Sequence, residues 1–239
     1  MKLCNEIWAL IPARSGSKNL KNKNIKLLKG KPLIHYSLMA AKKSPLISKV
    51  IFSSDSLKYI SLAKKFNCNY YHLRSKKSSR DFATDFEVFK EVVTFLKKKK
   101  IILPKFFVHL RPTTPIRKIS TINSAIRFFK KKEKYFTSLK SVTFNSHNSL
   151  KDYIVKRKKL FSINKKKGFN IDKVNLPSQN LTKTYIGSNV VDIYKTRNIL
   201  KGKLLGNRVY PFITHEPFCD IDTMHDFILC EYLFSNYIK

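Results

Sequence analysis

Short apolar runs alternate with segments of helical periodicity through the first half of the chain, and this alternation restricts the fold more than any other feature. The apolar runs expected to form strands are residues 6–11, 49–53, 69–73 and 106–110. Apolar residues recur at helical spacing over residues 33–43, 57–66 and 82–98. Strands that alternate with helices pair in parallel through crossover helices. We therefore expect an α/β fold with a Rossmann-like, mostly parallel sheet.

The second half of the chain keeps this pattern except over one internal stretch. The expected elements are a helix at 119–132, strands near 136–142 and at 189–194, and a last helix at 223–237 that residues 211–221 lead into. Residues 145–184 show only a predicted hairpin at 151–160 and a basic turn at 165–168. We interpret residues 1–239 as a single domain with an excursion from the sheet at about 145–184.

The length of 239 residues is enough to bury a core without disulfides or structural metals. The four cysteines are scattered without a Cys-x-x-Cys pair, which argues against a zinc module and a secreted disulfide scaffold. Arg14 and Lys18 close the first apolar run, which is unlike a signal peptide. No apolar stretch approaches the roughly 20 residues of a membrane span. We expect a soluble, cytoplasmic protein with no membrane partner.

The net charge suggests a rival interpretation. With 49 basic and 15 acidic residues the formal charge is +34, and such an excess ordinarily indicates a polyanion partner. Most of the excess is lysine, in runs at 97–100, 130–132 and 165–167. Nucleic-acid surfaces usually add arginine and stacking aromatic residues. We favour a solvated lysine coat and do not expect a nucleic-acid partner.

Four polar, turn-rich segments each follow a predicted strand: residues 12–24, 53–56, 74–85 and 111–117. Ligands of open α/β sheets collect at the carboxyl ends of the strands. We therefore expect these four loops to converge on one cleft.

The first of these loops has the composition of a phosphate site. Gly16 and Ser17 would let backbone N–H groups approach a phosphate closely, while Arg14, Lys18 and Lys23 would neutralise its charge. The pattern of a Walker loop is absent. A tight polar turn after a strand would explain Gly16 and Ser17, but not the basic cluster.

Two carboxylates stand near the end of the chain. Asp220 and Asp222 are two residues apart, so in extended structure they point the same way and can hold Mg²⁺. The alternative is that Asp222 caps the last helix, which leaves Asp220 unexplained. Cations around a polyphosphate together with carboxylate-held Mg²⁺ indicate phosphoryl or nucleotidyl transfer.

These residues carry a resemblance to a known family. The sequence from Ile11 to Lys18, with Lys23-Asn24 and then Gly30-Lys31-Pro32-Leu33, resembles the opening signature of acylneuraminate cytidylyltransferases. The resemblance continues in the family's order through residues 53–56, 111–117, 179–185, 189–193 and 220–222. It implies a fold of the nucleotide-diphospho-sugar transferase type and a CMP-sialic acid synthetase-like enzyme that uses CTP and Mg²⁺.

The resemblance also implies roles for individual residues in the nucleotide half of the site. Its implied nucleotide-binding residues are Ala13, Arg14, Gly16, Ser17, Lys23, Asn24, Arg74, Ala83 and Asp85. Among these, Arg74 and the backbone near Ala83 and Asp85 match the segment that reads cytosine. Asp220 and Asp222 match the metal-binding acids, and Arg14, Lys23 and Asp222 are the expected catalytic residues.

For the acidic nine-carbon sugar, the resemblance implies Arg111, Gln179, Tyr185 and Asn189 as contacts. A guanidinium can bind a carboxylate through two parallel hydrogen bonds, which suits Arg111 best, although a surface arginine before a proline turn is the alternative. The implied reaction is attack of the anomeric hydroxyl on the α-phosphorus, with Asp222 or a metal-bound water accepting the proton. The excursion matches an element that forms a homodimer contact in the family.

Three positions depart from the family pattern. Ser75 stands where a proline often follows the arginine, Ser178 replaces an arginine before Gln179, and Val190 replaces a glycine after Asn189. Substrate choice therefore stays open among sialic, legionaminic, pseudaminic and eight-carbon ulosonic acids. A basic polyanion-binding protein on a decayed transferase scaffold is the alternative from another class.

Overall fold

The computed structural model describes residues 2–164 and 170–237. Contacts within the chain divide it into two compact units. The first unit comprises Met1–Ser141 and Ser188–Lys239, and the second comprises Val142–Gly187. The basic turn expected at residues 165–168 lies outside the described residues. No helix of the described part is long and apolar enough to cross a membrane.

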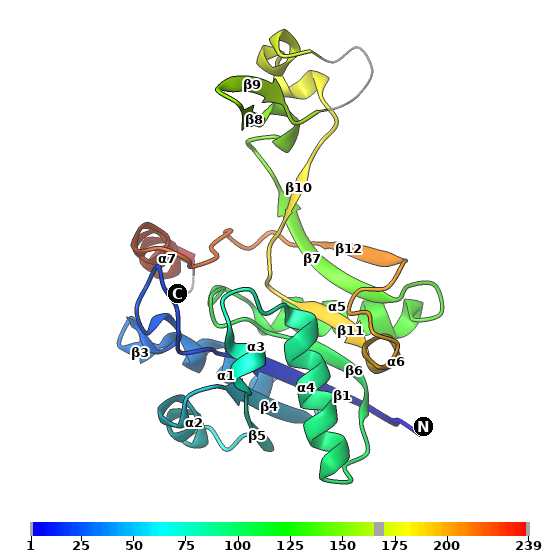
Figure 1. Ribbon diagram of the computed structural model, residues 1–239. Coiled ribbons are helices and arrows are strands. Elements are labelled where there is room, and N and C mark those ends of the chain that lie inside the picture. The colour runs from blue at the N-terminus through cyan, green and yellow to red at the C-terminus, as the bar shows by residue number, and fades with distance from the viewer. Residues whose placement is uncertain (1, 165–169, 238–239) are drawn as a thin grey trace. The chain divides into compact units, whose positions relative to one another are not determined.

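The first unit is built on a mostly parallel sheet, as predicted (Figure 1). Its strands are β1 (Cys4–Pro12), β4 (Lys49–Ser54), β5 (Tyr70–Leu73), β6 (Pro104–His109), β11 (Asp192–Lys195), β12 (Val209–Ile213) and the part of β7 (Ser138–Phe144) that ends at Ser141. Their order is β7-β11-β6-β1-β4-β5, and β12 pairs with β7. Strand β1 pairs in parallel with β4 and β6, and β4 with β5, whereas β11 runs antiparallel to β6 and β7.

Helices cover both faces of this sheet because successive strand residues point to opposite faces. The helices are α1 (Leu33–Lys43), α2 (Leu57–Lys64), α3 (Lys76–Ser79), α4 (Asp85–Lys98), α5 (Ile119–Lys132), α6 (Thr196–Leu200) and α7 (Met224–Tyr237). Ile7, Ala9 and Ile11 of β1 pack in one core cluster with residues of α1, α2 and α5. Trp8 and Leu10 pack in another with residues of α4 and α6.

Several element boundaries differ from the prediction. The helix expected from residue 82 begins at Asp85 because Thr84 caps it, accepting a hydrogen bond from the Glu87 N–H. The strand expected from residue 189 begins at Asp192, since Asn189 has a left-handed backbone with φ of 55°. The two-residue strands β2 (Leu27–Leu28) and β3 (Lys31–Pro32) form a hairpin that the pattern had not indicated.

The second unit contains the predicted hairpin, formed by β8 (Tyr153–Lys156) and β9 (Lys159–Ser162). Arg157 and Lys158 make its turn with positive φ. In the same unit β10 (Tyr185–Gly187) pairs antiparallel with the Val142–Phe144 portion of β7.

Candidate active site

A cavity of about 170 Å³ lies at the carboxyl ends of β1 and β6, and we call it the loop cavity. Its lining residues are Pro12, Arg14, Ser17, Lys23, Asn24, Arg74, Ala83, Asp85, Val88, His109, Arg111, Pro112 and Thr113. Three of the four predicted loops contribute to it. The loop at 53–56 does not line it, and the prediction is wrong on this point.

The loop at 53–56 instead forms hydrogen bonds with the first loop, residues 12–24. Asp55 accepts hydrogen bonds from the Ser15 backbone N–H, at 2.7 Å, and from the Ser15 hydroxyl, at 3.2 Å. The Ala13 N–H donates to the Ser53 carbonyl at 2.8 Å. A Cβ built on Gly16 would meet no atom within 4 Å, so the chain itself leaves open space beside this residue. The loop is therefore fixed on its inner side and open on the other.

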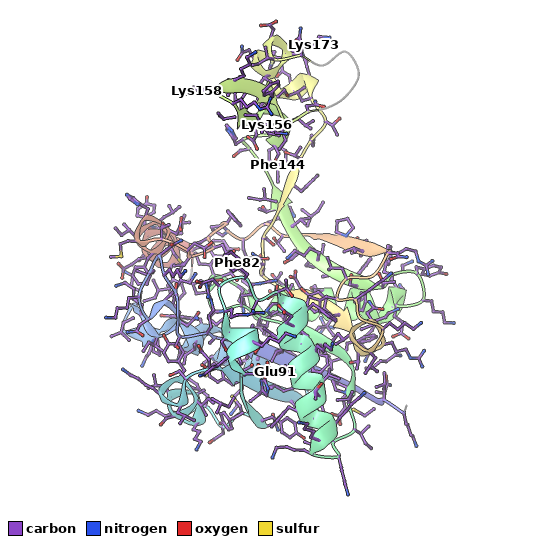
Figure 2. All side chains as sticks on the ribbon, in the orientation of Figure 1. Phe82, Glu91, Phe144, Lys156, Lys158 and Lys173 are labelled. Atoms are coloured by element: carbon purple, nitrogen blue, oxygen red, sulfur yellow. The ribbon has the colours of Figure 1, made fainter. Side chains whose placement is uncertain are left out.

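A second hollow, of about 300 Å³, shares Arg14, Ser17 and Lys23 with the loop cavity. We call it the adjoining hollow, and its other lining residues are Lys18, Asn19, Asp81, Phe82 and Asp222. Carboxylates contact the cations of this region: Arg14 and Lys18 lie 2.5 and 2.6 Å from Asp81, and Lys23 lies 2.7 Å from Asp222. Phe82, labelled in Figure 2, is 93% exposed on the loop before α4.

Three lining residues of the loop cavity, Asn24, Arg74 and His109, carry buried polar atoms without a hydrogen-bond partner among the described residues. Asn24 donates through Nδ2 to the Arg14 carbonyl at 2.8 Å, but its Oδ1 accepts nothing. Arg74 donates through Nη2 to the Ser78 carbonyl at 2.8 Å, while its Nε has no acceptor. Burial lowers the pKa of Arg74. Buried polar atoms are nearly always hydrogen-bonded to protein or ordered water, so Asn24 Oδ1 and Arg74 Nε are free to contact a ligand or a water in the loop cavity.

The two predicted metal acids have different partners. Asp220 accepts a hydrogen bond from Asn189 Nδ2 at 2.7 Å, and Asp222 pairs with Lys23. Thr223 and Asp226 form the cap of α7, because the Thr223 N–H donates to Asp226 at 2.7 Å and the Asp226 N–H donates to Thr223 Oγ1 at 3.3 Å. The alternative interpretation of Asp222 as the capping residue is therefore wrong.

Asp222 lines the adjoining hollow, whereas Asp220 lines neither that hollow nor the loop cavity, so the two carboxylates fit only a metal that takes most of its ligands from nucleotide and water. Among the residues that the structure describes, no group of three His, Cys, Asp or Glu side chains could hold a metal ion. Mg²⁺ is ordinarily bound by one or two carboxylates together with substrate phosphates and waters. The Asp222 side chain is 69% exposed and accessible to such a ligand, while the side chain of its partner Lys23 is 11% exposed.

Arg111 lies in the loop cavity between two carboxylates. Its Nη2 contacts Asp85 at 2.5 Å and its Nη1 contacts Asp192 at 2.8 Å. Burial lowers the pKa of Arg111, but the two carboxylates outweigh burial and hold that pKa above its ordinary value. The guanidinium is therefore charged and fixed in orientation, and both of its terminal nitrogens already donate to protein carboxylates.

Sequence reasoning missed three residues of this site: His109, Lys140 and Asp192. Lys140 lies 2.9 Å from both Asp192 and Asn189 Oδ1. His109 is fully buried, and neither of its ring nitrogens has a hydrogen-bond partner in the described part of the chain. Burial, followed by the charge of Arg111, lowers the pKa of His109 to about 3. A polar residue inside an otherwise apolar strand was the available signal for His109 and Asp192.

Two predicted sugar-binding residues belong to the second unit. Gln179 lies in a short 3₁₀ turn at Ser178–Asn180 and is exposed. Tyr185 lies in β10 and is also exposed, with its ring centroid 6.3 Å from that of Phe144. Their role toward a sugar stays a prediction.

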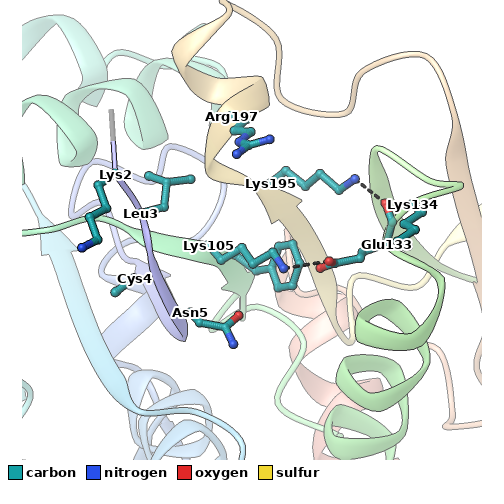
Figure 3. Close-up of a pocket in the computed structure, with 10 residues that line it drawn as sticks. Lys2, Leu3, Cys4, Asn5, Lys105, Glu133, Lys134, Lys195 and Arg197 are labelled. Atoms are coloured by element: carbon teal, nitrogen blue, oxygen red, sulfur yellow. Dashed lines mark hydrogen bonds and ion pairs between the residues drawn. The ribbon is translucent and has the colours of Figure 1, made fainter.

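A hollow larger than these two lies elsewhere in the first unit. It has a volume of about 700 Å³ and lies beside the first residues of β1 and β6 (Figure 3). Lys105 pairs there with the Glu133 carboxylate at 2.7 Å, and Lys195 donates to the Glu133 carbonyl at 2.5 Å. None of the predicted site residues lines it. The candidate site therefore rests on the convergence of loops and not on the size of a cavity.

Comparison with known proteins gives a family match and named relatives. A family model described as cytidylyltransferase matches residues 8–199. An N-acylneuraminate cytidylyltransferase from Escherichia coli is 36% identical over 130 residues, covering 54% of this chain and 30% of that protein. A CMP-N,N'-diacetyllegionaminic acid synthase from Legionella pneumophila is 36% identical over 140 residues, covering 57% and 59%. The matched regions thus span less than two thirds of these relatives.

A third relative matches along most of the chain. A pseudaminic acid cytidylyltransferase from Campylobacter jejuni is 24% identical over 230 residues, which cover 95% of each chain. Among solved structures, CMP:2-keto-3-deoxy-manno-octonic acid synthetase complexed with CTP superimposes with a TM-score of 0.66 at 12% identity, covering 97% of this chain and 99% of that one. At this identity the structural likeness supports the fold alone.

Proposed function

Because the chain belongs to the cytidylyltransferase family, we propose that it transfers CMP from CTP to the anomeric hydroxyl of a sialic-acid-like nine-carbon sugar acid and releases pyrophosphate. One observation carries the proposal. The loop cavity brings together Arg14, Lys23, Arg74 and Arg111 from three separate loops at the carboxyl ends of the strands.

The nucleotide would occupy the loop cavity and the adjoining hollow. Arg14, Lys23 and the backbone near Gly16 and Ser17 would hold the triphosphate, since cations and free N–H groups neutralise phosphate charge. The base would lie toward Arg74, Ala83 and Asp85. Arg74 Nε could then donate to an acceptor of the cytosine ring. Asn24 Oδ1 could accept a hydrogen bond from a hydroxyl of the ribose.

We propose Mg²⁺ as the cofactor, held by Asp220 and Asp222. When bound, the ion would offset charge on the triphosphate and on the pyrophosphate that leaves. Asp222 lies 2.7 Å from Lys23. The Lys23 ammonium and an ion held by Asp222 would therefore offset charge on the same phosphate groups. The protein would contribute mainly position and charge, as is usual where a phosphorus centre is attacked in line.

The sugar acid would lie beside the nucleotide, near Arg111 and Asn189. Arg111 would bind the carboxylate, because a guanidinium donates in the geometry that a carboxylate accepts. We keep Gln179 and Tyr185 as further proposed contacts of the sugar. The hydroxyl of the anomeric carbon would then attack the α-phosphorus of CTP.

Three further features belong to the same proposal. Legionaminic and pseudaminic acids stay alternative substrates in this proposal, because two relatives are named for them. Eight-carbon ulosonic acids are a further alternative. We propose a homodimer formed through the second unit. The four cysteines are unpaired, which fits a reducing compartment, and we propose the cytoplasm.

The test is pyrophosphate release with CTP, Mg²⁺ and a panel of nonulosonic acids, each component being omitted in turn. Release that requires CTP, the metal and one sugar acid would support the reaction and identify the acceptor. Folded protein that releases no pyrophosphate with any sugar acid of the panel would contradict the proposed reaction. Salt-dependent RNA binding by that silent protein would support the polyanion-binding alternative, which the charge of +34 motivates.

A further inference from the structure

We propose that Asp192 and Lys140 are positioning residues for the sugar-acid half of the loop cavity. They hold Arg111 and Asn189 in a fixed relation to each other, and so determine how the acid is bound. This inference rests on the proposed function and extends it to two residues that the sequence pattern did not indicate.

Asp192 is a buried carboxylate with five donors. Its Oδ1 accepts from the Ser141 N–H at 3.0 Å and from the Ser141 hydroxyl at 3.2 Å. Its Oδ2 accepts from Arg111 at 2.8 Å, from Lys140 at 2.9 Å and from the Tyr194 hydroxyl at 3.1 Å. A buried charge is tolerated only when it is paired and hydrogen-bonded in this way. Asp192 therefore has one orientation, and it fixes the Arg111 guanidinium from the sheet side.

Lys140 extends this chain of contacts to Asn189. Its ammonium lies 2.9 Å from Asn189 Oδ1 and 2.9 Å from Asp192 Oδ2. Asn189 donates in turn to Asp220 at 2.7 Å. Thr114 donates to the Asn189 carbonyl at 2.9 Å, which supports the left-handed backbone there. Contacts thus run without a break from Arg111, through Asp192, Lys140 and Asn189, to Asp220.

The network is better suited to orientation than to stability. Replacing a buried ion pair by apolar side chains of similar volume is often neutral or stabilising, so such a pair is weak evidence for a structural role. Here the pair of Asp192 and Lys140 lies next to Arg111, which lines the loop cavity. Asp192 and Asp85 each take one terminal nitrogen of Arg111. These two contacts set the plane of the Arg111 guanidinium. The carboxylate of the sugar must then accept from the N–H groups of Arg111 that the two aspartates leave unused.

The main test uses Lys140→Met, which removes the ammonium but keeps the length of the side chain. We expect the KM for the sugar acid to rise by about 10- to 100-fold, as the loss of a well-oriented hydrogen bond between Arg111 and the acid would cause. The KM for CTP and the kcat at saturating sugar should stay within about twofold of wild type, because the lost binding is shared by the ground state and the transition state. Lys140→Arg, which restores the charge, should recover most of the loss.

The matched control is Lys105→Met. Lys105 also forms a lysine–carboxylate pair, with Glu133 at 2.7 Å, and lies on β6 away from the loop cavity. We expect no change in either KM. Equal changes of both KM values in Lys140→Met, or failure of Lys140→Arg to recover activity, would overturn the positioning role.

A second measurement separates this inference from the proposed function. Arg111→Met, Asp192→Asn and the double variant form a cycle of urea unfolding free energies that needs no substrate. Non-additive losses would support the coupling of Arg111 to Asp192, and additive losses would overturn it. Absence of pyrophosphate release from wild-type protein would contradict the proposed function alone.

Discussion

Gly16 is a residue at which the chain itself does not require glycine. Its φ lies outside the left-handed region, and a Cβ there would meet no atom within 4 Å. We expect Gly16→Ala to leave the unfolding free energy within about 0.5 kcal/mol of wild type, but to weaken CTP binding because the methyl group would meet a phosphate. Calorimetric titration of CTP and urea unfolding would measure the two effects.

Gly206 is the matched control. It has a φ of +76°, and a Cβ there would lie 2.7 Å from Thr137 Cβ. Gly206→Ala should therefore lose stability without a specific effect on CTP. Unchanged CTP affinity in Gly16→Ala would contradict the close approach of a phosphate to this loop.

Asp222 is the second residue whose role can be separated from folding. Its ion pair joins a carboxylate that is 69% exposed to a Lys23 side chain that is 11% exposed, and asparagine keeps an oxygen that can accept from Lys23. We expect Asp222→Asn to abolish metal-dependent pyrophosphate release while changing the free energy of unfolding by no more than about 1 kcal/mol. Asp226→Asn, which loses the cap of α7, should have the opposite profile. Unaltered metal dependence in Asp222→Asn would refute its assignment as a metal ligand.

His109 should make the protein sensitive to acid. Burial lowers its pKa to about 3 from an ordinary value of 6.5, so between these values the unfolded chain binds more protons than the folded one. The contribution of neutral His109 to the free energy of unfolding is complete above about pH 6.5. It is lost as the pH falls toward 3, with a limiting slope of about 1.4 kcal/mol per pH unit. Urea unfolding of wild type and His109→Phe from pH 7 to 4 would reveal this difference. A difference that does not change with pH would contradict the prediction.

At the scale of elements, periodic apolar patterns located most of the fold. The helices predicted at 33–43 and 119–132 have the bounds of α1 and α5. Pattern failed for β12 and for the two-residue strands, because Pro211 stands within an edge strand and a two-residue strand carries no period. The start of α4 was missed because a capping box, rather than hydrophobicity, sets it.

That capping box offers a test at the N-terminus of α4. Thr84 Oγ1 accepts from the Glu87 N–H at 3.3 Å, and Glu87 accepts from the Thr84 N–H at 2.7 Å. We expect Thr84→Ala to cost about 1 kcal/mol of unfolding free energy. It should also raise the KM for the sugar acid, because the first turn of α4 carries Asp85, a partner of Arg111.

Thr94→Ala in the same helix is the control for this substitution. Thr94 donates to the Lys90 carbonyl within the helix, and alanine has the higher helix propensity. Equal losses of stability in both variants would argue against a specific role of the cap.

At the scale of the molecule, sequence order predicted which loops meet, but not the contacts between them. Residues 12–24, 74–85 and 111–117 follow parallel strands, so their convergence could be anticipated. The pairing of Arg111 with Asp85 and Asp192 could not, because it depends on the register of β11 against β6 and on where α4 begins. These are tertiary facts that no local pattern encodes.

The second unit leads to a prediction about assembly. Its hairpin exposes Val155, Leu160 and Phe161, with Val155 at 71% exposure, and large exposed apolar groups often mark interaction sites. If the unit mediates the proposed dimer, Val155→Asp with Phe161→Asp should yield monomers in sedimentation velocity experiments. Lys158→Asp at the turn of the same hairpin is the control. Dimers that persist in the double variant would place the interface elsewhere.

The central claim is transfer of CMP from CTP to a sugar acid, and ³¹P NMR of the complete reaction tests it most directly. Wild-type protein, CTP, Mg²⁺ and the accepted sugar acid should convert the three signals of CTP into one phosphodiester signal and one pyrophosphate signal. Omission of the sugar should leave CTP intact. Conversion of CTP into CDP and inorganic phosphate, or no conversion with any acid of the panel, would contradict the account.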